Sequence, residues 1–178
     1  MIRRLALVSS LAVLSAVAFA PKAGAVPATQ DVTFNGTVVG VCTFTGTTAG
    51  ALVNQNNNAW VEASTGSTIG NIGTAAQTTV NCTSGGQLAV SAPVKVAAPA
   101  NFTDTIKQAV VYDGTNFSSS TGTAFDTAGW AKPTTALTIP ANTNRTLNVA
   151  AIIGVNNVSS GVPVGTYNYK VTLTATPN

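Results

Sequence analysis

Polar and apolar residues alternate over Asp31–Val41, near the start of the chain, as they do in a β-strand with one apolar face. Polar side chains occupy the odd positions from Asp31 to Thr37. A cysteine, Cys42, follows the stretch directly. The pattern predicts an extended strand whose one face carries apolar residues of different sizes: Val32, Phe34, Gly36 and Val38.

A second alternating stretch, Gly165–Ala175, is the clearest strand signal in the chain. Asn168, Lys170, Thr172 and Thr174 fall on its polar side. Alternation alone does not tell which face would turn inward. The apolar side is formed by Tyr167, Tyr169, Val171, Leu173 and Ala175, and Pro177 is expected to stop the strand.

The segments between these two stretches read as further short strands separated by turns. Ala59–Gly73 and Thr115–Ala131 are expected to be loops, with Trp60 and Trp130 packing back onto the body. The composition favours Thr, Val, Ala, Asn, Gly and Ser, which form helices poorly. About seven strands in one domain predict an all-β protein, most simply a β-sandwich. The predicted strands are Ala75–Cys82, Gln87–Val96, Ile106–Tyr112, Thr134–Pro140 and Asn144–Val155, besides the two above.

The first 25 residues are typical of a cleaved secretion signal. Arg3 and Arg4 precede the apolar run Leu5–Ala20, and Ala23-Gly24-Ala25 is a small-residue cleavage site. An uncleaved membrane anchor would need a longer apolar run, so we expect no stable membrane insertion. The predicted organisation is a signal over residues 1–25, an extension over 26–41 and a β-domain over 42–178.

Processing changes the charge of the chain. The formal net charge of +3 includes Arg3, Arg4 and Lys22, and without them five basic side chains face five acidic ones. A net charge of zero gives no reason to expect nucleic acid as a partner. A neutral, charge-poor surface instead favours association between copies, because little repulsion keeps them apart.

The residue types needed for catalysis and metal binding are scarce. The chain has no histidine, which excludes Ser-His-Asp and Cys-His arrangements. Its acidic residues are scattered, and most lie in turn contexts, where aspartate is common for conformational reasons. No phosphate-binding loop occurs. We therefore expect no enzyme, no catalytic residues, no cofactor and no metal site. The two cysteines, Cys42 and Cys82, are most simply a disulfide in an exported chain.

Four features in order resemble the pilin subunits of the chaperone–usher pathway, including the spore coat protein U-like group. An alternating extension follows the signal, and Cys42 follows the extension. Cys82 ends a later strand, Val80-Asn81-Cys82. The run Val162–Tyr167 (VPVGTY) then leads into the alternating C-terminal strand. One departure is the end of the chain, Ala175–Asn178, which lacks the aromatic residue of many pilins and fits the spore coat-like branch better.

This resemblance implies an incomplete immunoglobulin-like β-sandwich that lacks its last strand. The gap would be a groove bordered by Tyr167, Tyr169, Val171 and Leu173. A periplasmic chaperone and an outer-membrane usher would be transient partners, and the extension of an identical or related subunit would finally fill the groove. Its donor residues would be Val32, Phe34, Gly36 and Val38, and Cys42–Cys82 would tie the first strand to the second. Asp31–Val41 could instead be an ordinary edge strand of a closed sandwich.

The implied function is that of a structural subunit of a surface fibre, a pilus or a coat that supports adhesion or biofilm, exported through the periplasm. The alternative is a self-contained secreted β-sandwich that binds carbohydrate through Trp60 or Trp130, although buried core aromatics are the simpler interpretation of both tryptophans.

Overall fold

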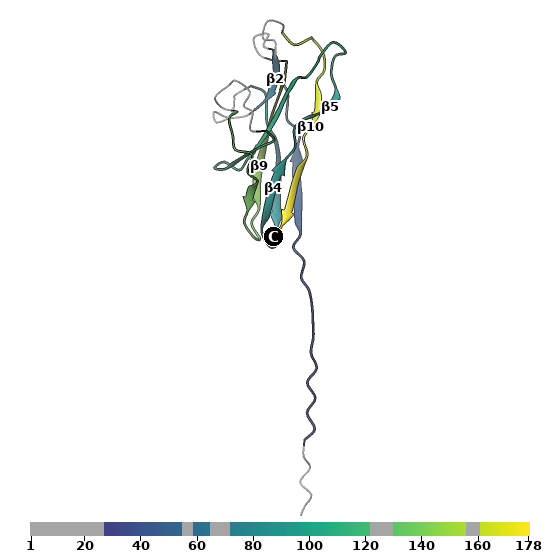
Figure 1. Cartoon of the computed structure of the whole chain (residues 1–178), viewed down its shortest axis with the longest axis vertical. Helices are drawn as coiled ribbons and strands as arrows, with labels where there is room; N and C mark the ends of the chain where they lie inside the picture. Colours follow the sequence, from purple (N-terminus) through teal and green to yellow (C-terminus); the bar gives the residue numbers. More distant parts are fainter. Residues whose placement is uncertain (1–26, 55–58, 65–71, 122–129, 156–160) are drawn as a thin grey trace, which may run out of the picture. The chain divides into compact units, whose positions relative to one another are not determined.

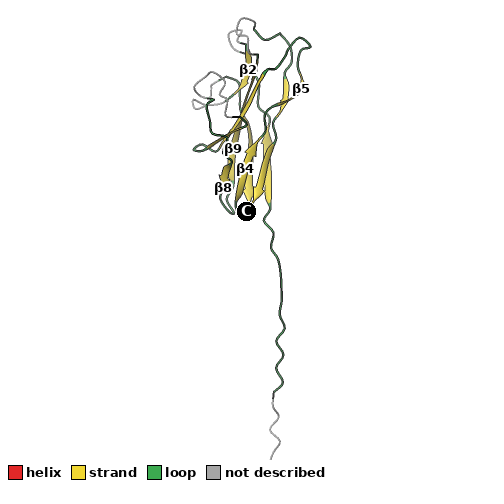
Figure 2. Cartoon of the chain, in the orientation of Figure 1, coloured by secondary structure: helices red, strands yellow, loops and turns green. Residues whose placement is uncertain are grey.

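A computed structural model of the chain describes residues 27–54, 59–64, 72–121, 130–155 and 161–178. These residues form antiparallel β-sheets and no helix (Figure 2), which confirms the all-β prediction. The chain divides into two units between Thr37 and Val38. In the first unit, the described residues 27–37 form no strand. The predicted signal over residues 1–25 lies outside the described residues.

The larger sheet has β9 (Arg145–Gly154) at its centre. On one side β9 pairs with β6 (Ile106–Tyr112), which pairs with β7 (Phe117–Ser119). On the other side, the first half of β9 pairs with β3 (Ala76–Cys82) and the second half with β2 (Trp60–Ala63). β1 (Cys42–Thr48) pairs with β3 and forms the edge of this sheet (Figure 1).

The second layer is built from the remaining strands, which form two short antiparallel groups. β4 (Gly86–Val90) lies between β8 (Leu137–Ile139) and β11 (Leu173–Pro177), while β5 (Val94–Ala97) pairs with β10 (Asn168–Lys170). The Ser91 amide donates to the Thr172 carbonyl at 2.9 Å, and the Thr172 amide donates to Ser91 Oγ at 2.9 Å. These two hydrogen bonds link the segment between β4 and β5 to the segment between β10 and β11, so the two groups are continuous.

The core lies between the two layers, and its largest cluster draws side chains from both. Because successive residues of a strand point to opposite faces, the alternating apolar positions collect on the inner faces. The second sheet contributes Leu88, Leu137 and Ile139, and the larger sheet contributes Val80, Val111 and Leu147, all almost fully buried. A separate cluster toward β2 contains Val61, Phe102 and Ile153, with Tyr167 and Tyr169 packed against it.

β9 is apolar on both faces, unlike the edge strands. Its outward-facing residues Ala150 and Ile152 are covered by Trp130, which is only 1% exposed and packs with Val110 and Tyr112. Gln108 Nε2 donates to the Trp130 carbonyl at 2.8 Å and holds this cover on the sheet. The expectation that Trp130 packs onto the body is confirmed.

The predicted disulfide is present. Cys42 and Cys82 lie directly opposite each other on β1 and β3 and are bonded, with a sequence separation of 40. Closing a loop of that length is worth about 4 kcal/mol in the chain-entropy model. Gly86 packs against this bond so closely that an added Cβ would lie 2.6 Å from the Thr176 carbonyl oxygen and 3.1 and 3.3 Å from the two sulfurs.

Several strand boundaries differ from those predicted. Eleven strands are present in the described part of the chain, where about seven were expected. The segments 59–73 and 115–131, predicted as loops, contain β2 and β7. The C-terminal strand is split into β10 and β11, and it continues through Pro177, which lies opposite Gly86, rather than stopping before it. Pro177 is tolerated there because β11 is an edge strand.

Replacing Gly86 by alanine should destabilise the fold by about 2 kcal/mol, because the new methyl group meets backbone and disulfide atoms that cannot move away. Gly36→Ala is the matched control: no atom lies within 4 Å of its Cβ position, so its free energy of unfolding should change by less than about 0.5 kcal/mol. Urea unfolding of both variants with the disulfide intact measures the difference. Equal stabilities would contradict the packing described at Gly86.

Candidate docking groove

Two strand edges lie open on the same side of the body. The first edge belongs to β1, which pairs with β3 on its other side. The second belongs to β10 and β11, which pair with β5 and β4. On the open side none of these three strands pairs with another strand of the described residues. An open edge presents a row of backbone N–H and C=O groups that can accept a further strand. The two edges therefore form two sides of a site for an extended chain.

An apolar groove of about 740 Å³ lies between these edges. Phe44 and Leu52 line one side, and Phe44 is 38% exposed although it is a large aromatic residue. The floor comes from inward-facing positions of the larger sheet and is unusually small in side-chain volume. It includes Ala63, Ala76, Val149 and Ala151.

The opposite side of the groove is formed by the C-terminal strands. All four residues that the sequence predicted there, Tyr167, Tyr169, Val171 and Leu173, line the groove. Tyr167 and Tyr169 also pack against the cluster around Phe102, and Leu173 packs against the main core cluster. The alternating apolar face of Gly165–Ala175 is thus the face turned toward the core. Their role as an acceptor site stays a prediction.

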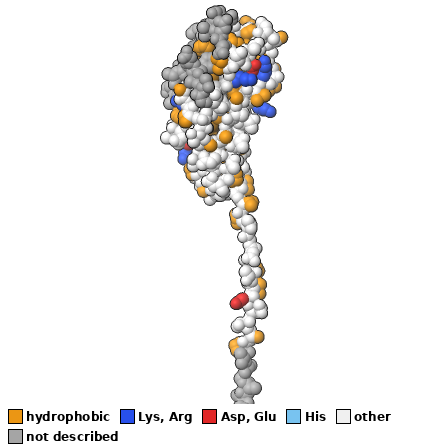
Figure 3. Space-filling view, in the orientation of Figure 1, with side chains coloured by type: hydrophobic (Ala, Val, Ile, Leu, Met, Phe, Trp, Pro, Cys, Tyr) orange, Lys and Arg blue, Asp and Glu red, His pale blue; other side chains and the backbone are white. Residues whose placement is uncertain are grey.

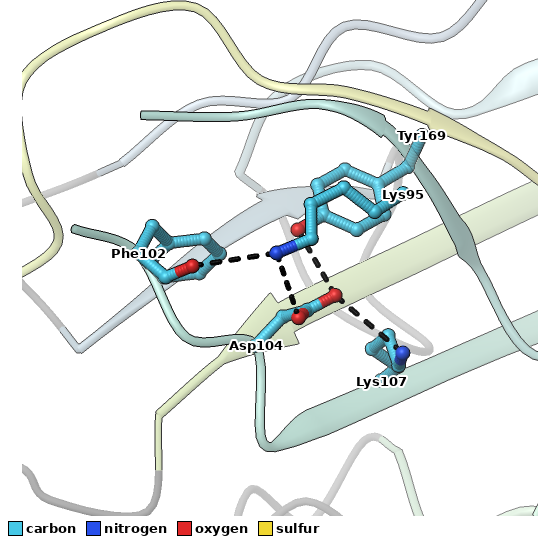
Figure 4. A network of polar contacts seen from close by, with 5 residues as sticks. All are labelled: Lys95, Phe102, Asp104, Lys107 and Tyr169. Atoms are coloured by element: carbon cyan, nitrogen blue, oxygen red, sulfur yellow. Dashed lines mark hydrogen bonds and ion pairs between the residues drawn. The ribbon is translucent and has the colours of Figure 1, made fainter. Parts of the chain in front are cut away.

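An ion-pair network holds one end of the groove (Figure 4). Asp104, whose side chain is 11% exposed, lies 3.2 Å from Lys95 Nζ on β5 and 3.5 Å from Lys107 Nζ on β6. The Tyr169 hydroxyl donates to Asp104 Oδ2 at 3.2 Å, and Lys95 Nζ donates to the Phe102 carbonyl at 3.4 Å. One carboxylate therefore joins strands of both layers to a residue that lines the groove.

The environment of Asp104 favours its charged form. Burial alone would raise the pKa of this carboxyl, but the hydrogen bond from Lys95 and the charge of Lys107 outweigh burial and hold the pKa below its ordinary value. Burial and the neighbouring carboxylate both raise the pKa of Tyr169. The network is consequently ionised at Asp104 and protonated at Tyr169 at neutral pH.

Tyr167 is held in a different way from its neighbour. Its ring packs edge-on against Phe102, with ring centroids 4.9 Å apart and an angle of 88° between the planes. Its hydroxyl donates to the Pro163 carbonyl at 2.5 Å. The two tyrosines of the groove are therefore anchored independently, one by an ion-pair network and one by an aromatic contact and a backbone oxygen.

The predicted donor residues lie apart from this site in sequence and are exposed. Val32, Phe34 and Val38 are 70%, 90% and 98% exposed, and no atom lies within 4 Å of the Cβ position of Gly36. The residues predicted as a strand, Asp31–Val41, form none in the single chain. Their alternating apolar face is thus available, and their role as a donor stays a prediction.

The end of the extension is fixed where it joins β1. The Thr83 amide donates to the Val41 carbonyl at 2.9 Å, and the Val41 amide donates to Thr83 Oγ1 at 3.0 Å. A Cβ at Gly40 would lie 2.1 Å from Ser84 Oγ and 2.9 Å from Pro177 Cβ, so only glycine allows the chain to pass so close. Sequence reasoning missed Gly40, although a glycine two residues before Cys42 marks a close approach of this kind.

The two tryptophans considered for carbohydrate binding do not form an open site. Trp130 is 1% exposed, and Trp60 is half-buried and packs against the same cluster. Between them lies Glu62, which is 4% exposed and accepts a hydrogen bond from Ser64 Oγ at 2.5 Å. Burial raises the pKa of Glu62, and hydrogen bonds from Ser64 and from Trp60 and Trp130 offset this only in part.

Groups suited to chemistry are not gathered in the described part of the chain. No cluster of three or more His, Cys, Asp or Glu side chains occurs there. Asp113 accepts hydrogen bonds from the Thr115 and Asn116 amides and pairs with Arg145 at 3.4 Å, which is a structural role in a turn. On the face in Figure 3, charged side chains are sparse among apolar and uncharged polar ones. No helix among the described residues is long and apolar enough to cross a membrane.

Comparison with protein-family models, curated proteins and solved structures finds no match to this chain.

Glu62 should make the stability of the protein depend on pH. A folded-state pKa above the unfolded value adds stability at low pH, and this contribution is lost as the pH rises through the folded pKa. Glu62→Gln keeps the size and a hydrogen-bond acceptor but cannot ionise. The stability of the wild type relative to Glu62→Gln should therefore fall as the pH rises above the ordinary carboxyl pKa of 4.5, as measured by urea unfolding at each pH. A constant difference would show that Glu62 does not titrate abnormally.

Proposed function

We propose that this chain is a structural subunit of a surface fibre, in which the extension of one copy fills the groove of the next. The observation that carries the proposal is the presence, in one chain, of two complementary unfilled features. One is an exposed, alternating apolar extension; the other is an apolar groove between two open strand edges. The extension has an apolar face that needs a surface to cover it, and the groove has open strand edges that need a strand to pair with.

Strand addition is the physical basis of this joint. A strand laid between β1 and the edge formed by β10 and β11 would pair its backbone with both open edges, and its apolar side chains would enter the groove. The backbone hydrogen bonds would supply affinity, and the fit of alternate side chains would supply specificity. The exposed Phe34 and Phe44 would both leave water, and burial of a phenylalanine side chain is worth about 1.5–3 kcal/mol.

The sizes of the side chains favour one direction of insertion. Donor and groove residues share the two-residue repeat of a strand, so four donor positions face four groove positions. Antiparallel to the C-terminal segment that contains β10 and β11, Gly36 lies opposite Tyr169 and Phe34 lies opposite Val171. In the parallel direction Phe34 meets Tyr169 and Gly36 meets Val171, which crowds one position and leaves the other unfilled. The proposed antiparallel order is Val32, Phe34, Gly36 and Val38 against Leu173, Val171, Tyr169 and Tyr167.

The contacts at the end of the extension favour a second copy as the source of the strand. Val41 is bonded to Thr83, and Gly40 passes between Ser84 and Pro177. Folding back into its own groove would require the chain to reverse direction just before β1, where these contacts already fix it. Donation to another copy keeps them. Because donor and acceptor are different surfaces, the contact is heterologous and repeats without closing, as a fibre requires.

The proposed partners and location follow from the same joint. An open groove is a risk for aggregation before assembly, so a periplasmic chaperone would cap it and an outer-membrane usher would order the exchange. Once the predicted signal is removed with Arg3, Arg4 and Lys22, five basic and five acidic residues remain, and this neutral chain would pack into a fibre with little repulsion. The fibre, a pilus or a coat, would lie at the cell surface and support adhesion or biofilm. Carbohydrate binding through the tryptophans gains no support, since Trp130 is buried.

Gly36→Trp should abolish polymer formation, because an indole cannot fit opposite Tyr169. Asn35→Trp is the matched control: it adds the same side chain on the opposite face of the strand, and polymers should form normally. Unboiled gel electrophoresis of the exported chain measures both, since wild-type multimers should appear as a ladder that collapses to monomer on heating.

Two results would contradict the proposal in different ways. A monomer under every condition in the wild type would remove the fibre function. Normal ladders from Gly36→Trp would leave the fibre in place but show that the proposed alignment of the extension is wrong.

A further inference from the structure

We infer that Asp104 is a positioning residue for the groove: it locks Tyr169 in place, and the locked ring admits glycine but not larger donor residues at the position it faces. This inference rests on the proposed function, because it assigns a selecting element to the groove in which the extension is proposed to bind.

Side chains from three strands contact Asp104 and so hold Tyr169 in position. The Asp104 carboxylate accepts a hydrogen bond from the Tyr169 hydroxyl on β10 at 3.2 Å. It also forms ion pairs with Lys95 Nζ on β5 at 3.2 Å and with Lys107 Nζ on β6 at 3.5 Å (Figure 4). With a side chain only 11% exposed, the carboxylate has little solvent to compete for these donors. Movement of the tyrosine hydroxyl would leave a buried acceptor without one of its partners, which is costly.

A fixed ring has a consequence that a mobile ring would not have. Tyr169 lines the groove, whose open volume is about 740 Å³ and whose lining includes small residues such as Ala63 and Ala151. An unanchored tyrosine could swing toward this space and make room for a larger donor residue. Held by Asp104, it stays beside the donor strand and penalises any side chain larger than hydrogen. Specificity of this kind comes from a built-in clash with the wrong partner.

Tyr167 provides the internal comparison. It lines the same groove and has the same side chain, but it is held by Phe102 and by the Pro163 carbonyl. Its hydroxyl does not enter the Asp104 network. Removing the hydroxyl of each tyrosine in turn therefore separates the effect of the network from a general loosening of the groove.

The test measures how well the groove distinguishes two donor peptides. The acceptor is the full chain carrying Phe34→Asp, which disables its own extension. The probes are fluorescent synthetic peptides with the sequence of residues 31–41, one native and one with alanine in place of Gly36. Fluorescence anisotropy gives both dissociation constants, and their ratio is the discrimination. Circular dichroism and the intact disulfide confirm that each acceptor is folded.

We expect the native peptide to bind roughly tenfold more tightly than the alanine peptide, as for a clash of moderate size. Tyr169→Phe and Asp104→Ala should reduce this ratio to about twofold. Asp104→Asn keeps an oxygen that accepts from the tyrosine hydroxyl and should retain most of the discrimination, and Tyr167→Phe should retain all of it. A purely structural role for Asp104 would weaken both peptides equally and leave the ratio unchanged.

The outcomes separate the inference from the function on which it rests. If both peptides bind and Tyr169→Phe leaves the ratio unchanged, or if the unmodified groove binds both equally, the lock is refuted and the proposed function stands. If neither peptide binds any acceptor, the proposed function fails, and the inference fails with it. Should Asp104→Ala not fold, Tyr169→Phe decides the question, because it removes a single hydroxyl.

Discussion

The unsatisfied backbone along two facing strand edges is the constraint on which the rest of this structure depends. β1 has one edge that pairs with no strand in the described part of the chain, as do β10 and β11, and an apolar groove of about 740 Å³ lies between these edges. Closing the edges on each other would satisfy the backbone but eliminate the groove. The structure keeps them apart at one end, with small residues on the floor and two anchored tyrosines on the wall.

The two ends of the groove are fixed by different chemistry. At one end, the disulfide lies beside Gly86, and β11 passes close to the start of β1 through Pro177 and Gly40. At the other end, Asp104 joins β5, β6 and β10 through charged hydrogen bonds. The disulfide joins two strands of the larger sheet, whereas the Asp104 network joins strands of both layers.

The alternation of apolar residues predicted the fold class and the strands that carry it, because burial on one face imposes a two-residue period. It also identified Tyr167, Tyr169, Val171 and Leu173 as one face, and the disulfide followed from the even number of cysteines. The alternation did not reveal β2 or β7. β2 is buried on both faces, and β7 has buried serines where apolar residues would be expected, so neither strand shows an alternating pattern. The Asp104 network could not be predicted, because it joins residues that are far apart in sequence, Lys95 and Tyr169 among them. The proposed use of the groove rests on complementarity, which local pattern suggests but only binding can test.

The position of the disulfide has a mechanical consequence for the proposed joint, in which the extension would carry load between copies. Val41 is held to Thr83 by hydrogen bonds alone, and the next residue, Cys42, is the first that is covalently bonded to β3, so tension along the extension would reach its first covalent cross-link there. Without the bond, the pull would separate β1 from β3 one hydrogen-bonded pair at a time, which requires little force. The bond instead passes the load directly to β3, whose other edge pairs with β9 in the middle of the sheet. Force would then be shared by several strands at once, and the edge strand that borders the groove would keep its shape when the proposed fibre is stretched.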